Sequence, residues 1–313
     1  MAIHACNRAR ILRKNEYHQT SDIHISRSMM ITLVLSTISL MIPMSLLTQK
    51  GYHSLWVWPI LLIAIFFIVN FIITNRQATH PIVHFHTLFS KKPFVGATMA
   101  ISSHLTLLTG IAGINVYIVR ILKLPFDISL HFYFFFFVGV IITGILKMFF
   151  YSSVGAGFLG TLGSSALLYV SIHWIILGNT INIPLLYIQG LLLGFGASMT
   201  LVSGSMATLL DGDLKEAAQR SQTMHTIRNF SAAMLIPIIA YTIKNHIQKG
   251  TQSIYAENIT DKMIYLKKLQ DVAIDADHQI FLLMIIFNMV MFVSSIIQMI
   301  LGKGRRITPP RES

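Results

Sequence analysis

Long apolar segments recur along this chain, and they constrain its fold more than any other feature. Eight of them run at about 28–48, 55–74, 94–119, 129–149, 154–178, 183–210, 226–245 and 279–301. A helix needs roughly 20 apolar residues to cross the hydrocarbon core of a bilayer. A backbone in lipid must satisfy its own hydrogen bonds, which favours helices. The sequence therefore predicts an all-α polytopic membrane protein with about eight transmembrane helices.

The composition agrees with this class. The chain is 54% hydrophobic and only 12% charged, whereas a globular domain usually has about 25% charged residues. Its single cysteine, Cys6, excludes a disulfide framework and a cysteine-based metal site. The net charge of +12 is explained by basic cytoplasmic loops, so the lipid bilayer is an expected partner and nucleic acid is not.

The distribution of basic residues predicts the orientation. With the N-terminus inside, the inner segments hold 16 of the 24 lysines and arginines, and the outer segments hold 8. Excess Lys and Arg mark cytoplasmic loops. We therefore expect a multi-pass protein of the cell (inner) membrane with both termini in the cytoplasm.

Five regions follow from the apolar pattern. They are a basic cytoplasmic tail (1–27), a two-helix membrane hairpin (28–74), a cytoplasmic amphipathic linker (75–93), a six-helix bundle (94–301) and a second basic cytoplasmic tail (302–313). Within the linker, Pro81 is placed to open a short surface helix. The segment at 246–278 is expected to be a solvated amphipathic loop.

A glycine-rich span, "GLLLGFGASMTLVSGSMATLL", precedes a mixed-charge loop and then "RNFSAAMLIPIIAY"; the linker reads "NRQATHPIVHFHTLFSKKPFVGA". This order of motifs resembles the C-terminal half of the fourteen-helix drug:proton antiporters of the major facilitator superfamily. The resemblance covers the chain from about residue 28. Two stretches depart from the family pattern: "LKMFFYSSVGAG" lacks the expected charges, and "FSAAM" replaces a glycine-rich step.

The resemblance implies half of a major-facilitator fold plus a two-helix linker. It implies proton-coupled efflux of drugs or other small amphipathic solutes, by a fragment or one chain of a split transporter. The partners would then be a small-molecule substrate, the proton, and a separate N-terminal six-helix half or a second copy. The alternative is a non-transporting membrane subunit or an inactive remnant that binds a partner.

Ionisable groups within a membrane are costly and indicate function. All twelve acidic residues fall in predicted tails, loops or span boundaries, so no carboxylate is expected near the middle of the bilayer. His104 lies near the middle of its span, and Asn115 shares its face. In the family, the first, second, fourth and fifth helices of each half line the substrate cavity, which adds Gln189. The alternative for all three residues is hydrogen bonding between packed helices.

Glycines and one arginine complete the candidate site. Gly190, Gly194 and Gly196 are candidates for close helix packing or for a hinge in alternating access. Arg228 is expected about one turn inside its span, after a cytoplasmic turn at 211–225. It is either an interfacial anchor or an inner gate that pairs with Asp211 or Asp213.

No arrangement of residues predicts catalysis, so we do not expect an enzyme. His80, His84 and His86 have a spacing that suits a metal, but no carboxylate or cysteine supports them. We expect no metal site and no cofactor.

Overall fold

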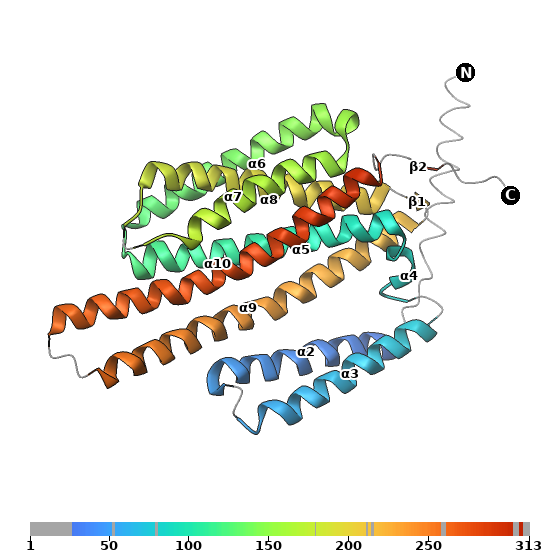
Figure 1. Ribbon diagram of the computed structural model, residues 1–313. Helices are drawn as coiled ribbons and strands as arrows, with labels where there is room; N and C mark the ends of the chain where they lie inside the picture. Colours follow the sequence, from blue (N-terminus) through green and yellow to red (C-terminus); the bar gives the residue numbers. More distant parts are fainter. Residues whose placement is uncertain are drawn as a thin grey trace, which may run out of the picture. The chain divides into compact units, whose positions relative to one another are not determined.

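A computed structural model gives the fold. It describes residues 27–51, 54–78, 81–178, 180–210, 216–257 and 261–302, and the backbone of two further dipeptides. The elements, shown in Figure 1, are α2 (Arg27–Lys50), α3 (Val57–Gln77), α4 (Phe85–Leu88), α5 (Lys91–Asn115), η1 (Val116–Ile121), α6 (Phe126–Val154), α7 (Ala156–Ile175), α8 (Ile183–Leu210), β1 (Gly212–Asp213), α9 (Ala217–Ala256), α10 (Lys262–Ile300) and β2 (Ile307–Thr308).

Eight helical spans are long and apolar enough to cross a membrane, and these are α2, α3, α5 with η1, α6, α7, α8, α9 and α10. The prediction of an all-α polytopic membrane protein is therefore confirmed. In the described part of the chain, the β-structure is limited to β1 and β2, which pair in parallel with Gly212 opposite Ile307.

The chain divides into two compact units, 1–40 with 59–82 and 41–58 with 83–313. In the first unit, the hydroxyls of Thr32 on α2 and Thr74 on α3 lie 3.4 Å apart. Met29, Ala64 and Phe71 are buried there. Near the end of α3, the side-chain oxygen of Asn75 accepts a hydrogen bond from the backbone N–H of Ile82 at 2.9 Å.

The second unit holds the six long helices α5 to α10, which lie side by side in Figure 1. Half of the apolar window of α5 and of α8 is buried, because α8 packs on α5, α6 and α7, and α5 also packs on α9 and α10. The core between them is aromatic and aliphatic, and its largest buried side chains include Trp174, Tyr117, Phe132 and Phe281.

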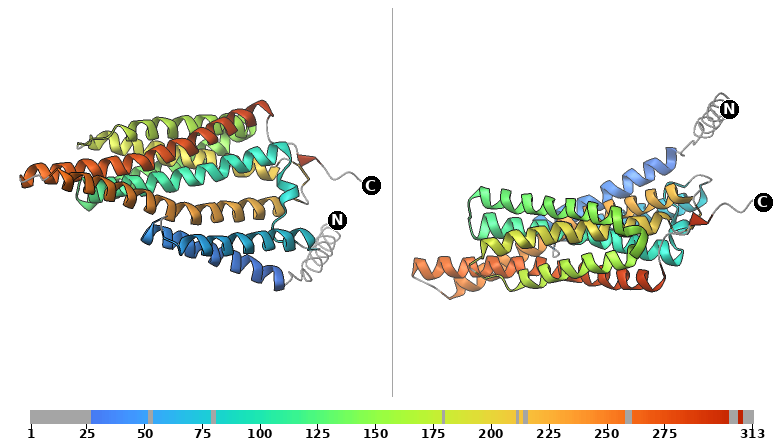
Figure 2. Two further views of the ribbon diagram at one scale, coloured as in Figure 1. Left: turned by 60° about the horizontal axis from the view of Figure 1, so that its bottom comes forward. Right: turned by 90° about the horizontal axis from the view of Figure 1, so that it is seen from above.

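The last two helices are longer than the sequence predicted. The expected loop at 246–278 is wrong, because α9 continues to Ala256 and α10 begins at Lys262. Asp261 starts α10 as its N-cap and accepts the N–H of Met263 at 2.8 Å. Figure 2 shows this end of the α9–α10 hairpin extending past the other helices of the unit. Apolar segments report where a helix meets lipid, and both helices continue beyond that part.

Two shorter segments also differ from expectation. The turn after α8 is shorter than 211–225, because α9 already begins at Ala217. In the linker, the short helix is a single turn, Phe85–Leu88. Its Leu88 is buried with Ala97, Ala100 and Met224, so α4 packs on α5 and α9.

Candidate functional site

Polar side chains connect the helices of the second unit. The hydroxyls of Ser103 and Thr200 lie 2.6 Å apart and join α5 to α8. The amide of Asn288 donates to the Ser171 hydroxyl at 2.9 Å and joins α10 to α7. Such bonds hold transmembrane helices together where no hydrophobic effect separates protein from lipid.

Gln189 belongs to this interhelical set. It is only 1% exposed, and its side-chain oxygen accepts a hydrogen bond from the indole N–H of Trp174 at 2.8 Å. Trp174 lies on α7 and is part of the main hydrophobic core. The structure therefore places Gln189 between α7 and α8.

His104 and Arg228 lie close together where α5 meets α9. Arg228 acts electrostatically on the half-buried imidazole of His104 and on His225. Its Nε atom is buried and has no hydrogen-bond partner in the described part of the chain. His104, a candidate cavity residue, and Arg228, the candidate gate residue, thus lie at the same interface between α5 and α9.

Arg228 lies 11 residues after Ala217, the first residue of α9, because this helix begins before the apolar segment at 226–245. Its expected depth of about one turn inside the span stays a prediction. Asp211 lies outside the described residues, and of Asp213 only the backbone is described. The gate with these carboxylates stays a prediction.

Asn115 has a different neighbour. It is the last residue of α5, and its side chain interacts with Tyr133 of α6. Each of the three expected cavity residues is therefore engaged at a different place: His104 at α5–α9, Asn115 at α5–α6 and Gln189 at α7–α8.

The three candidate glycines allow helices to touch. A Cβ atom on Gly194 would lie 1.9 Å from the carbonyl oxygen of Phe136, and one on Gly190 would lie 2.8 Å from that of Phe132. Gly196 faces α7 in the same way, at 2.6 Å from the oxygen of Gly163. All three thus serve close helix contact in this conformation.

Lys147 is a buried cation, although the sequence predicts it in an inner segment. It lies inside α6, which continues for about two more turns to Val154. The side chain is largely enclosed, at 9% exposure. Its ammonium group donates to the carbonyl oxygen of Ser198 on α8 at 2.5 Å. Sequence hydropathy alone does not distinguish a lysine inside a long span from one at its end.

Asp277 is a buried carboxylate, although the sequence predicts a loop at its position. It is 1% exposed, and neither carboxyl oxygen has a hydrogen-bond partner among the described residues. The expected loop is wrong at this position, because α10 begins 15 residues before Asp277; Asp277 lies in a helix, two residues before the apolar segment at 279–301. The helical spacing of Ile274, Asp277 and Phe281 was the available signal, since it places the acid on an apolar face.

Arg220 is a second buried cation, although the sequence predicts it in a loop. Its guanidinium donates to the carbonyl oxygens of Thr208 and Leu209, both at 3.0 Å, and it lies 3.4 Å from Glu216. The last carbonyls of a helix have no partner within that helix. Arg220 thus caps α8 and fixes the turn into α9.

The linker adds a histidine to this end of the bundle. The backbone N–H of His84 donates to the Thr223 hydroxyl at 2.9 Å. Burial lowers the pKa of His84, and the nearby charge of Glu216 partly opposes that effect. His86 is present but His80 lies outside the described residues. No group of metal-ligating side chains occurs among the described residues.

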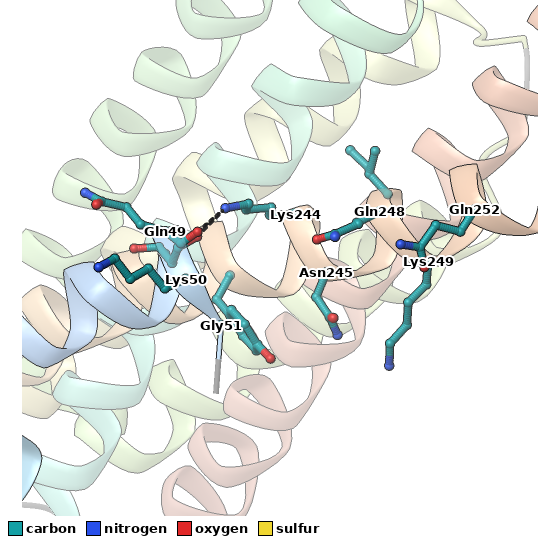
Figure 3. Close-up of a pocket in the computed structure, with 11 residues that line it drawn as sticks. Gln49, Lys50, Gly51, Lys244, Asn245, Gln248, Lys249 and Gln252 are labelled. Atoms are coloured by element: carbon teal, nitrogen blue, oxygen red, sulfur yellow. Dashed lines mark hydrogen bonds between the residues drawn. The ribbon is translucent and has the colours of Figure 1, made fainter. Parts of the chain in front are cut away.

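A pocket of about 780 Å³ lies within the second unit, between residues 48–51 and α9 (Figure 3). Lys244 donates to the carbonyl oxygens of Thr48 and Gln49, at 2.9 and 2.7 Å, and so neutralises the C-terminal end of α2. Lysines and amides form most of its lining. None of the predicted cavity residues lines it.

No protein-family model matches the chain, and no curated protein is similar to it in sequence. The membrane class therefore follows from the eight helical spans themselves.

Proposed function

We propose that the chain is a transport protein that moves small amphipathic solutes out of the cell in exchange for protons. It works with a second helical bundle, supplied by a separate polypeptide or by a second copy. The observation that carries this proposal is the presence of ionisable side chains enclosed among the spans, Lys147 and Asp277 above all.

These groups are hard to explain as supports of the fold. An unpaired charge in an apolar interior is strongly destabilising, and apolar residues of similar volume often stabilise a core as well as or better than buried charges. Ionisable groups inside transmembrane bundles typically serve ion or substrate pathways. Lys147 has one backbone acceptor, and Asp277 has no hydrogen-bond partner among the described residues.

The properties of α9 suggest that this helix bends during transport. Its apolar window is the least buried of the spans, at 11%, and Pro237 lies within it. A proline removes one backbone hydrogen bond and allows a helix to bend. Since Arg228 and His104 meet across α9 and α5, bending of α9 changes the surroundings of both groups. Alternating access requires motion of this kind around a fixed site.

The exposed side chains of α9 are evidence that a second bundle binds there. Ile236 is exposed on it, as is Asn229, which lies about two turns earlier on the same face and beside the half-buried Arg228. A surface that combines apolar and polar side chains suits a protein partner across a solute path better than lipid alone, because polar groups in lipid are costly.

The test uses the chain with its native partners. The chain is extracted in mild detergent with any polypeptide that co-purifies and is reconstituted into vesicles that contain a pH-sensitive dye. A lipophilic organic cation should drive proton flux in preparations that contain two bundles, and the isolated single chain should give none. Absence of flux in every such preparation would instead favour a non-transporting membrane subunit.

A further inference from the structure

We propose that Asp277 is a proton-binding site whose occupancy controls the attachment of the loop between α7 and α8. The proposal rests on the proposed function, since it names the side chain that carries the coupled proton.

Asp277 faces the inside of the bundle. Ile274 and Phe281 lie one turn before and one turn after it, and both are buried on the same side of α10. That side packs on the end of α5, where Phe281 fills the space beside Gly113. Tyr117 lies one turn after Gly113, at the start of the wider π-helix η1, and interacts electrostatically with Asp277.

The geometry points to a proton and not to a metal ion. Calcium takes six to eight oxygen ligands and magnesium requires six, but no cluster of three metal-ligating side chains exists in the described part of the chain. A proton needs only one carboxyl oxygen. Both oxygens of Asp277 lack a hydrogen-bond donor there, and a bound proton removes the large penalty of burying an unpaired carboxylate.

Tyr117 and His278, the residue that follows Asp277 on α10, hold the loop after α7. The hydroxyl of Tyr117 donates to the carbonyl oxygen of Gly178. Nε2 of His278 lies 2.8 Å from the carbonyl oxygen of Leu177 and must therefore donate to it. The loop after α7 is thus fastened at two consecutive carbonyls, one by η1 and one by α10.

Loss of the proton changes this arrangement. Release to water leaves a carboxylate, which accepts hydrogen bonds more strongly than a neutral carbonyl oxygen. The carboxylate of Asp277 then competes with Gly178 for the Tyr117 hydroxyl proton. Tyr117 keeps its proton and only exchanges its acceptor, so one of the two fastenings of the loop is lost.

Other ionisable groups lie around this end of α10. On α10 itself these are Asp271, Asp275 and His278, and η1 adds Arg120 beside Tyr117. Because Gly250 of α9 packs on Val272, α9 brings His246 and Lys249 alongside. α7 contributes His173, whose ring stacks on Tyr169.

Asp275 provides a matched control. It is exposed on the same helix, two residues before Asp277, so Asp275→Asn removes a carboxylate without touching the buried site. Asp277→Asn replaces the carboxyl by a neutral group of the same shape and mimics the protonated state, which preserves folding.

Infrared spectroscopy of the purified full chain in lipid shows directly whether the Asp277 carboxyl is protonated. The wild type and Asp275→Asn should show the C=O band of a protonated carboxyl near neutral pH, and the band should disappear at higher pH. It should be absent from Asp277→Asn. The same band in Asp277→Asn, or its absence from the wild type at every pH, overturns the assignment.

The mobility of a nitroxide spin label on the loop between α7 and α8 measures whether the loop is released. The label is attached to Thr180→Cys in a Cys6→Ala background, since Cys6 is the single native cysteine. The label should become more mobile in the wild type as the infrared band disappears, stay immobile in Asp277→Asn, and be mobile at every pH in Tyr117→Phe. Equal mobility in all three proteins contradicts the switch. Neither measurement needs transport, so a missing flux with an intact band rejects the proposed function and leaves the proton site standing.

Discussion

Replacing Gly194 by alanine tests the close packing of α6 against α8. The new Cβ atom would lie 1.9 Å from the carbonyl oxygen of Phe136, whereas ordinary contacts begin at 3.4 Å. The backbone of α6 therefore has to retreat by about 1.5 Å, the difference between these two values. Overpacking of this kind destabilises a protein by about 1–3 kcal/mol.

Gly144 provides the control for this variant. It lies on α6, and a Cβ atom there meets nothing within 4 Å. Alanine is favoured over glycine in a helix by about 0.5–1 kcal/mol, and this gain applies at both positions. The difference between Gly194→Ala and Gly144→Ala therefore isolates the steric term of about 1–3 kcal/mol.

The measurement is the unfolding of both variants in mixed micelles titrated with a denaturing detergent. Gly194→Ala should unfold at a lower detergent fraction than the wild type, and Gly144→Ala at the same fraction or a higher one. Equal stability of the two variants would refute the contact between the backbones of α6 and α8.

Three further predictions concern polar groups. Arg220→Met should cost about 1.5–3 kcal/mol, typical of hydrogen bonds to a charged group, and should speed hydrogen exchange in the turn after Leu209; normal exchange there would contradict the cap. The pKa of His84 is lowered by burial, so its neutral form is favoured in the fold. Its contribution to stability is complete above the unfolded value of about 6.5 and is lost as the pH falls below it. Acid should therefore increase hydrogen exchange in the linker, and His84→Gln should abolish that pH dependence. Cysteine at His104 in a Cys6→Ala background should react with a water-soluble thiol reagent, and complete protection in every state would exclude contact with a polar path.

The number of spans was predictable because apolar length is a local property of the sequence. The eight segments correspond to eight helical spans, since a bilayer demands roughly 20 apolar residues wherever a helix crosses it. The ends were not predictable in the same way. Residues 246–256 and 262–278 are polar enough for water, but they remain helical because a helix satisfies its backbone in either solvent.

The site was harder to predict because neighbours across helices are not encoded locally. Hydropathy found His104 within a span, but its proximity to Arg228 depends on how α5 and α9 pack. Gln189 was found for its polarity, but its bond to Trp174 places it between helices. The burial of Asp277 was not predictable from hydropathy, because it depends on the packing of α10 on α5 in a stretch polar enough to be taken for a loop.

The central claim is that buried ionisable groups of this chain couple proton movement to solute movement. The most direct measurement is proton flux driven by a lipophilic organic cation in vesicles that hold the chain with its native partners. The wild type and Asp275→Asn should both give solute-dependent flux, and Asp277→Asn should move solute without protons. Solute-dependent proton flux that is undiminished in Asp277→Asn, or its absence from the wild type, would contradict this account.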